Sequence, residues 1–213
     1  MTRRSARRTG EAAFCLALSV SLGRAQEEVS TVASANQQQV LRIAENVRKQ
    51  IVTLPQYGVF DNINFGIKGS DTVVLMGQAS RPTLKSGAER VVSKIEGVKT
   101  VDNQIEVLPN SPNDDRIRSA VYAAIYSYPV LQKYTSNRGR PRGGPSVARA
   151  AGGITADPPL GFHAIHIIVK NGNVTLTGVV NSDTDLAIAE MRANGVSGVF
   201  SVANDLQVAS KEK

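Results

Sequence analysis

The segment KNGNVTLTGVV, residues 170–180, combines an Asn-Gly hairpin turn with a strand that alternates apolar and polar residues and ends near a glycine. A similar segment, KGSDTVVLMGQA, occupies residues 68–79. When the sequence is shifted by 101 positions, its two halves match at a series of apolar, glycine and asparagine positions. A repeat of about 100 residues is too long for a solenoid unit, so it predicts two small domains of the same fold. The matching positions are Val73, Leu75, Gly77, Gly97, Val98, Val101, Asn103, Ile105 and Val107 with Val174, Leu176, Gly178, Gly198, Val199, Val202, Asn204, Leu206 and Val208.

Residues 36–109 predict a first module with the element order α-β-β-α-β. Asn36 begins a capping-box pattern, and the apolar residues that follow it recur at helical spacing. Alternating apolar residues on both sides of the Gly-Ser-Asp turn at 69–71 predict a β-hairpin. A second helical pattern ends at Gly97, and residues 98–108 close the module as a strand.

Residues 113–208 predict a second module with the same order. Asn113 is expected to cap its first helix, and residues 163–180 form its hairpin. Ser182 and Asp185 begin its second helix in capping-box spacing, and a last strand follows. The fold class is therefore α+β, with two tandem modules that each have a small three-stranded sheet and two helices packed on one face.

The second module differs from the first by an insertion at residues 135–161, TSNRGRPRGGPSVARAAGGITADPPLG. Module one has only PQYGVFD, residues 55–61, at the same place. The Gly, Pro and Arg content of the insertion predicts a loop or disordered segment that cannot bury a core. The link between the modules, residues 109–115, is short and rich in turn residues, so we expect the modules to lie close together.

Residues 1–25 have the three parts of a secretory signal peptide. A basic start at 2–8 precedes the short apolar run AAFCLALSVSL at 12–22, and the small residue Ala25 offers a cleavage site. The run is shorter than the about 20 residues that a membrane-spanning helix needs, which leaves a retained amphipathic anchor as the alternative. Five arginines and one glutamate lie in this segment, so cleavage lowers the net charge from +7 to +3. We therefore expect a periplasmic or secreted protein.

Residues 162–208 resemble the BON domain, the bacterial osmotically induced and nodulation domain. The resemblance is carried by IHIIVKNGNVTLTGVV, residues 165–180, and RANGVSGVFSVANDLQV, residues 192–208. Module one is similar to the same family but matches more loosely. The resemblance implies a tandem BON protein like the periplasmic osmotic-stress proteins, in which the modules are not enzymes. It also implies binding to anionic phospholipid or a part in the survival of envelope stress.

The motif positions of that family fall on four glycines in this chain, two in each module. A glycine that ends or precedes a strand relaxes a turn or lets two backbone segments approach closely. We therefore expect these glycines to serve the backbone and not to contact a ligand. They are Gly77, Gly97, Gly178 and Gly198.

The sequence lacks the residue patterns of the common catalytic and metal sites. His163 and His166 lie on a predicted strand, where a spacing of three turns their side chains to opposite faces, so they cannot chelate one ion. The chain has no GxSxG motif and no serine with a credible histidine and acid. Asp114 and Asp115 adjoin a helix start, where acidic residues favour the helix dipole. The sequence therefore predicts neither an enzyme nor a cofactor.

The basic segment RGRPRGG, residues 138–144, resembles an AT-hook, whose arginines enter the DNA minor groove. The same arginines suit an anionic membrane, where each basic residue near the surface contributes about 1 kcal/mol. Aromatic and basic side chains of the preceding helix would extend such an interface. An alternative places some of these tyrosines, Tyr128 in particular, in the core. The candidate lipid-binding residues are Arg116, Arg118, Tyr122, Tyr126, Lys133, Tyr134, Arg138, Arg140 and Arg142.

These observations predict an exported, non-enzymatic envelope protein that binds anionic phospholipid surfaces or envelope proteins and supports membrane integrity or stress tolerance. The main alternative is a protein-interaction or holdase-like module that uses exposed sheet edges or helix grooves. Nucleic-acid binding through RGRPRGG is a remote alternative, because export removes the protein from DNA. The effect of salt distinguishes lipid binding from the protein-interaction alternative. Attraction between charges weakens as the ionic strength rises, whereas binding through apolar contacts does not.

Overall fold

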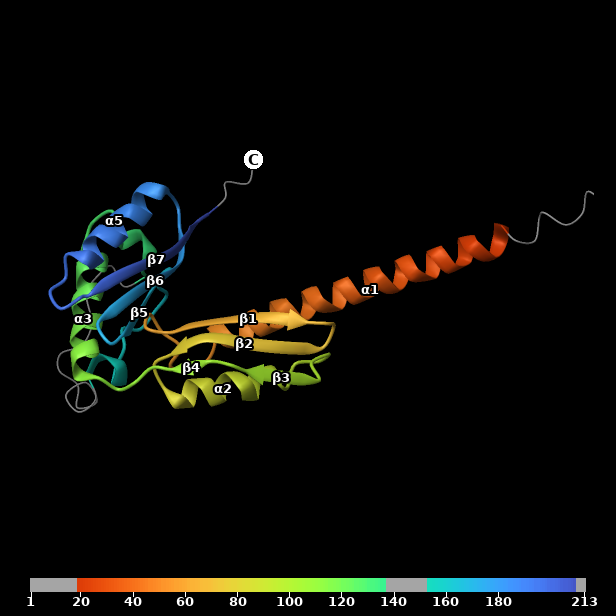
Figure 1. The fold of residues 1–213 in the computed structure, drawn as a ribbon, viewed down its shortest axis with the longest axis horizontal. Helices are drawn as coiled ribbons and strands as arrows, with labels where there is room; N and C mark the ends of the chain where they lie inside the picture. The colour runs from red at the N-terminus through yellow and green to blue at the C-terminus, as the bar shows by residue number, and fades with distance from the viewer. Residues whose placement is uncertain (1–18, 137–152, 210–213) are drawn as a thin grey trace, which may run out of the picture.

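The computed structural model describes residues 19–136 and 153–209, which form two α+β modules (Figure 1). Each module follows the order α-β-β-α-β, which confirms the fold class expected from the repeat. Module one contains α1 (Ser19–Val52), β1 (Asn62–Lys68), β2 (Thr72–Ala79), α2 (Pro82–Val92), β3 (Thr100–Asn103) and β4 (Glu106–Val107). Module two contains α3 (Pro112–Tyr126), the 3₁₀ helix η1 (Gln132–Tyr134), β5 (Ile165–Lys170), β6 (Asn173–Val180), α5 (Asp183–Asn194) and β7 (Ser201–Val208).

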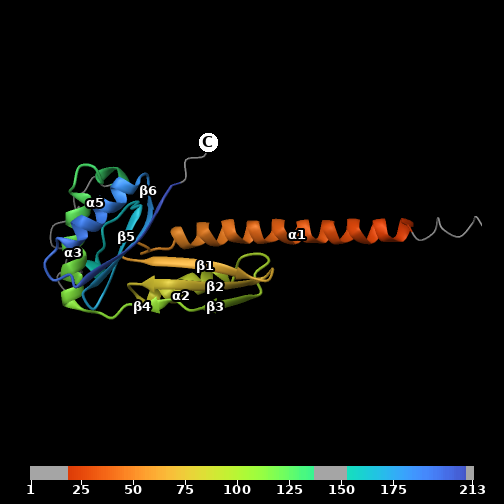
Figure 2. The same ribbon diagram turned by 45° about the horizontal axis from the view of Figure 1, so that its top comes forward.

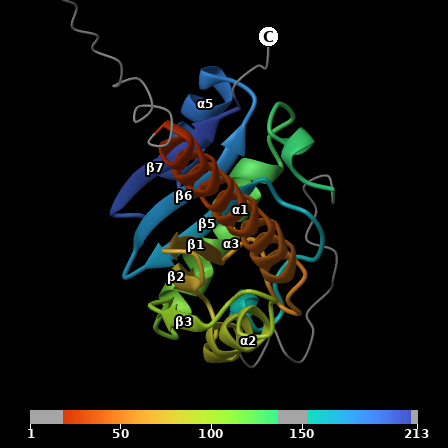
Figure 3. The same cartoon turned by 90° about the vertical axis from the view of Figure 1, so that its right-hand side faces the viewer.

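The two sheets have the same topology. In module one, β2 lies between an antiparallel β1 and a parallel third strand that is divided into β3 and β4. In module two, β6 lies between an antiparallel β5 and a parallel, unbroken β7. The parallel pairs arise because a helix, α2 or α5, connects their strands and carries the chain back. Figure 3 shows α1 and α2 on the same side of the module-one sheet.

In each module, the middle strand carries a glycine where its backbone comes very close to the backbone at the start of the hairpin, and we call this point the backbone crossing. Gly77 and Gly178 have φ angles of 106° and 122°. A Cβ atom on Gly77 would lie 2.0 Å from the carbonyl oxygen of Asn62, and one on Gly178 would lie 2.0 Å from that of Ala164. No side chain fits at such a distance, so both hairpins require glycine at this point.

An asparagine ties the last strand of each module to its second helix. The Asn103 side-chain amide donates hydrogen bonds to a carbonyl of α2 and to Glu89 Oε2, both at 3.0 Å. Asn204 makes the equivalent bonds to α5, with Glu190 Oε2 at 3.0 Å. The repeated asparagine seen in the sequence is therefore a structural clamp, made twice.

The first helices of the modules can be aligned through their contacts with a second pair of glycines. Gly97 and Gly198 have φ angles of 91° and 93° in the turn before the last strand. Ile43 of α1 lies beside Gly97, and Ile117 of α3 lies beside Gly198. Ile43 and Ile117 therefore hold equivalent places, and the two helices can be compared residue by residue from that point.

Module one docks with one end of its sheet against module two (Figures 1 and 2). The Ile167 N–H donates to the carbonyl oxygen of Val59 at 2.7 Å, and Val59 and Phe60 belong to the buried core of module two. On the open face of the module-two sheet, Ile168 is buried together with Leu108 of module one. The two modules therefore share a packed junction, in agreement with the short link between them.

Two helix starts differ from the sequence-based expectation. Helix α1 begins at Ser19 and runs through Asn36, which was expected to be its cap. No proline or glycine lies between Arg24 and Val52, so nothing in the backbone stops the helix at Asn36. Helix α3 is capped by Ser111, whose hydroxyl accepts from the Asp114 N–H at 3.2 Å, and not by Asn113. Figures 1 and 2 show that the N-terminal part of α1 extends beyond the sheet of module one.

The end of the insertion is packed, although its composition suggested a segment without a core. Ile154 is 5% exposed within the module-two core, and Pro159 is buried. Residues 153–156 form a helical turn. The prediction failed here because one apolar residue is sufficient to anchor a returning chain when a core lies beside it. Residues 137–152 of the insertion lie outside the described part of the chain, as do residues 1–18 of the expected signal peptide.

We predict that Gly178→Ala destabilises the protein by at least about 2 kcal/mol, because the new Cβ meets a backbone oxygen that has no room to move. Gly195→Ala is the matched control, since Gly195 has a φ of −74° and an added Cβ there stays 3.6 Å from its nearest neighbour. Urea unfolding followed by circular dichroism measures both changes. Equal stability of the two variants would contradict the crossing as the reason for this glycine.

Candidate functional site

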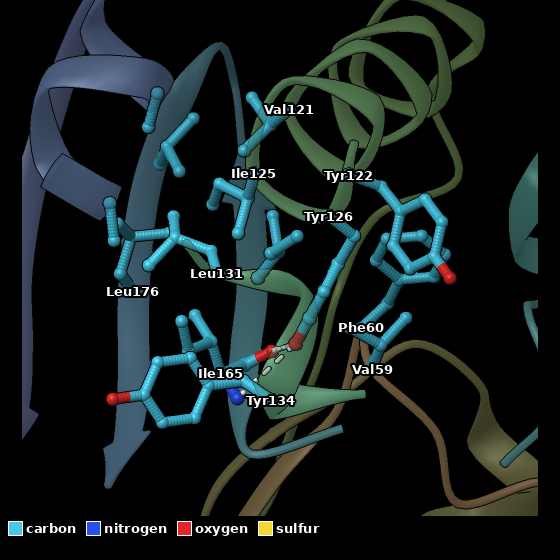
Figure 4. Close-up of a cluster of buried hydrophobic side chains, with 14 of the residues drawn as sticks. Val59, Phe60, Val121, Tyr122, Ile125, Tyr126, Leu131, Tyr134, Ile165 and Leu176 are labelled. Atoms are coloured by element: carbon cyan, nitrogen blue, oxygen red, sulfur yellow. Dashed lines mark hydrogen bonds between the residues drawn. The ribbon is translucent and has the colours of Figure 1, made fainter. Parts of the chain in front are cut away.

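Four of the residues expected at a lipid surface lie inside the protein. Arg118, Tyr122, Tyr126 and Tyr134 are at most 4% exposed. They occupy the side of α3 and η1 that faces the module-two sheet, and the three tyrosines belong to its core (Figure 4). These side chains are not available to a membrane, and the sequence-based expectation is wrong for them. Aromatic and basic residues at helical spacing looked amphipathic, but tertiary packing covers their face of the helix.

Two of these buried side chains cap the outer edge of β5. The Tyr126 hydroxyl donates to the carbonyl oxygen of Ile165 at 2.6 Å and accepts from the Ile165 N–H at 3.2 Å (Figure 4). The Arg118 guanidinium donates to the carbonyl oxygen of Val169 at 2.8 Å. Together with the Val59 carbonyl of module one, these groups satisfy the backbone of an edge strand that would otherwise be open to pairing.

A buried ionic network joins α3 to the end of the insertion and to module one. Arg118 Nη1 lies 2.7 Å from Asp115 Oδ1 and 3.1 Å from Thr155 Oγ1. The Thr155 hydroxyl also donates to Asp115. From module one, Arg81 Nε donates to the carbonyl oxygen of Thr155 at 3.0 Å. Residue 155 therefore links the two modules through polar groups that are largely withdrawn from water.

The other candidate residues are exposed or lie outside the described residues. Arg116 is exposed and donates to Asn113 Oδ1 at 2.8 Å. The Lys133 side chain is 46% exposed and pairs with Asp185 at 2.8 Å. Tyr128 is half-buried and lies under the Arg192 guanidinium. Arg138, Arg140 and Arg142 fall in residues 137–152, so the structure does not bring them to any site.

The two histidines serve different parts of the structure. His163 is buried between the rings of Tyr122 and Tyr126, and its Nε2 lies 3.1 Å from the Tyr122 hydroxyl. His166 lies at the module junction, with Nδ1 3.2 Å from the Gly58 carbonyl oxygen. Burial lowers the pKa of both imidazoles, to about 4 for His163. Among the side chains of residues 36–136 and 153–209, no group of three or more His, Cys, Asp or Glu could hold a metal ion.

A cleft opens on one side of the module junction. It consists of two adjoining cavities of about 540 and 700 Å³. One wall comes from the C-terminal end of α1 and from residues 62–65 of β1, and the other comes from the open face of the module-two sheet. The residues that line both cavities are Arg48, Val52, Tyr57, His166, Gly178 and Val179.

Polar side chains cross the floor of this cleft in a row. His166, Thr177 and Asp205 are partners in the register of β5, β6 and β7, and all three line the cleft. Thr177 is 9% exposed, and its hydroxyl has no hydrogen-bond partner in the described part of the chain. Sequence reasoning did not find this site because Arg48 and these three residues come from four separate elements, and no local pattern connects them.

The comparison with protein-family models matches the BON domain in two segments, residues 39–109 and 149–210. The chain belongs to the BON family. The two matched segments correspond to the two modules, and the second of them includes Gly178 of β6 and Gly198 of the turn before β7. The BON domain is generally a non-catalytic module. The comparison with curated proteins gave no match.

Among solved structures, the chain is similar to the C-terminal domain of CdsD, a structural protein of the type III secretion system of Chlamydia trachomatis. One structure of it is 15% identical, with coverage of 78% of this chain and 96% of that chain and a TM-score of 0.24. A second CdsD structure is 14% identical, with coverage of 79% and 93% and the same TM-score of 0.24. No functional argument follows from a likeness at this level.

None of the helices in residues 19–136 and 153–209 is both long enough and apolar enough to cross a membrane.

We predict that Tyr126→Phe lowers the free energy of unfolding by about 1–3 kcal/mol, because it leaves both backbone groups of Ile165 buried without a partner. Tyr128→Phe is the control, since this half-buried tyrosine stacks with Arg192 through its ring, which phenylalanine keeps. Urea unfolding compares the variants. A loss of unfolding free energy of similar size in both variants would show that the hydrogen bonds of the Tyr126 hydroxyl to Ile165 do not stabilise the protein specifically.

The pKa of His163 predicts a loss of stability in mild acid. Burial holds this pKa at about 4, against 6.5 for an unburied histidine, so between these values the unfolded chain binds a proton that the native state does not. The contribution of neutral His163 is complete above pH 6.5 and is lost as the pH falls toward 4. His166 acts in the same direction, whereas Asp61, whose pKa burial raises, acts in the opposite direction.

We therefore expect His163→Gln to flatten the decline in unfolding free energy between pH 6.5 and pH 4, measured by urea unfolding at both values. The measured quantity is the difference in unfolding free energy between the two pH values, so a change in stability that is the same at both values does not affect the result. An equal decline in the variant and the wild-type protein would contradict His163 as its source.

Proposed function

We propose that this BON protein is exported and works at the cell envelope, where it binds anionic phospholipid surfaces and supports membrane integrity under stress without catalysing a reaction. Family membership supports an envelope- or phospholipid-related role at the level of the domain. The signal-peptide pattern of residues 1–25 supports export.

The observation that carries the proposal is an exposed apolar loop at the returning end of the basic insertion. Leu160 is 80% exposed and Phe162 is 69% exposed. Large apolar side chains at a loop tip, next to basic residues, suit the interface between lipid head groups and acyl chains. We name residues 160–162 the apolar loop.

Ser136, which precedes the run of arginines in the sequence, is hydrogen-bonded to this loop. The Ser136 N–H donates to the Phe162 carbonyl oxygen at 3.1 Å, and the Ser136 hydroxyl accepts from the Phe162 N–H at 3.1 Å. The run of arginines at residues 138–142 starts two positions after Ser136. In the proposed mode, Arg138, Arg140 and Arg142 attract anionic head groups, and Leu160 and Phe162 enter the interface.

The experiment is co-sedimentation of residues 26–213 with vesicles of phosphatidylcholine, with and without phosphatidylglycerol, at low and high salt. Binding is expected only with the anionic lipid and is expected to weaken at high salt. Changing Arg138, Arg140 and Arg142 together to Ser removes three charges of about 1 kcal/mol each, so affinity should fall by roughly 100-fold.

A second pair of variants separates the apolar loop from general surface hydrophobicity. Leu160→Ser with Phe162→Ser should weaken binding at low and at high salt. Met191→Ser with Phe200→Ser is the matched control, because these two side chains are 62% and 79% exposed on other elements. No binding under any condition, or equal losses in both pairs, would contradict a lipid surface at residues 160–162.

A further inference from the structure

The outer edge of β1 has the same geometry as the edge of β5 that α3 caps. In β5, the N–H groups of Ile165 and Ile167 point away from β6 and find partners outside the sheet. Ile63 and Phe65 hold the corresponding register positions in β1, opposite Gly77 and Leu75. Because outward and inward backbone groups alternate along an antiparallel strand, the Phe65 N–H and the Ile67 carbonyl also point outward.

The two α3 side chains that cap the edge of β5 have no counterpart on α1. With Ile43 equivalent to Ile117, the places of Arg118 and Tyr126 on α3 fall to Ala44 and Val52 on α1. Neither side chain can hydrogen-bond to a strand. The Tyr57 hydroxyl lies against the Ile63 amide, which is at the start of the strand.

Beyond Ile63, the edge of β1 stays free in the part of the chain that the structure describes. Neither the Phe65 N–H nor the Ile67 carbonyl has a hydrogen-bond partner on this side among those residues. An edge strand of seven residues with free backbone groups is a template for pairing with another strand.

This free edge faces the cleft between the modules. Residues 62–65 of β1 form one wall of the 540 Å³ cavity, opposite Thr177 and Val179. Val52 and Val179 are 57% and 48% exposed and offer apolar contacts. Arg48 and Asp205 line the same cavity from opposite walls, and neither has an ion-pair partner in residues 36–136 and 153–209.

We propose that the outer edge of β1 binds an extended peptide segment of another envelope polypeptide, which joins the module-one sheet as an additional strand. A row of alternating N–H and C=O groups is matched by the backbone of a polypeptide in extended conformation, which identifies the chemical class of the partner. The apolar pair Val52 and Val179 contacts alternate side chains of the peptide, and Arg48 and Asp205 pair with one acidic and one basic residue. The peptide site adjoins the apolar loop, because Gly161 and Phe162 line the 700 Å³ cavity of the same cleft. The two proposals are therefore tested separately, with the peptide in the absence of vesicles and with vesicles in the absence of the peptide.

The probe is the acetylated and amidated peptide Glu-Thr-Val-Thr-Val-Thr-Lys, which has high strand propensity and one charge of each sign. It is titrated without vesicles into the ¹⁵N-labelled protein. Saturable shifts of the Phe65 and Ile67 amide signals are expected, larger than those of Asn64 and Gly66, whose amides bond to β2. Absence of saturable shifts, or equal shifts at all four amides, would overturn the proposal.

Two N-methylated forms of the peptide test whether its backbone makes the contact. One form is methylated on the three threonine nitrogens and the other on the two valine nitrogens, so each loses the donors of one edge. Only one of the two forms is expected to bind, because only one edge of the peptide faces β1. Binding of both forms would show that side chains alone hold the peptide, which contradicts strand addition.

Protein variants locate the site. Ala44→Arg places a guanidinium where Arg118 has one in module two, at the Ile67 carbonyl, and it should lower the peptide affinity by about 10-fold or more. Leu41→Arg is the matched control, since Leu41 is 59% exposed on the same helix and does not line the cleft. Equal affinities of the two variants would contradict an open edge at β1.

A second matched pair tests the module-two wall of the cleft. Val179→Ser removes an apolar side chain that is 48% exposed on this wall, so the peptide loses a contact, with an expected affinity loss of about fivefold. Met191→Ser is the matched control, because Met191 is 62% exposed on α5 and lines neither cavity of the cleft, so it should leave the affinity unchanged. The opposite order of effects would contradict a peptide in the cleft.

Discussion

The constraint on which this structure depends is that a three-stranded sheet has two edges, and each edge has backbone groups that need partners or water. Module two meets this demand at β5 with a tyrosine hydroxyl, a guanidinium and a carbonyl from module one. The side chains that cap the edge are therefore buried, and the loop that supplies the carbonyl is held at the junction. The docking of the modules and the burial of Tyr126 and Arg118 have the same cause.

The duplication preserved the fold and changed the edges. The crossing glycine and the clamping asparagine are present in both modules with nearly the same geometry, since each is needed to close the sheet on its helices. The first helices differ at the positions that face the edge strand, where Arg118 and Tyr126 correspond to Ala44 and Val52. The first strand of one copy is thus capped, and the first strand of the other has a free edge beside a cleft.

The two proposed surfaces use different physics. The apolar loop at residues 160–162 and the arginines near it depend on long-range charge attraction, which salt weakens, and on apolar contact. The edge of β1 depends on directional backbone hydrogen bonds, which charge screening affects little. Because Phe162 of the apolar loop lines the same cleft, a protein with both surfaces would hold a polypeptide segment beside the membrane.

The sequence alone determined the repeat, the α+β modules, the glycine positions and the BON family, because each of these depends on local residue spacing. Apolar residues alternate in strands and recur at helical spacing in helices, and glycine occurs where the backbone leaves no room for a side chain. It misassigned Arg118, Tyr122, Tyr126 and Tyr134, since an aromatic and basic stripe looks the same on a helix whether its face meets lipid or a strand edge. The tertiary structure decided that question. It also decided the cleft, because the open edge of β1, Thr177 and Asp205 meet only when the end of one sheet packs on the face of the other.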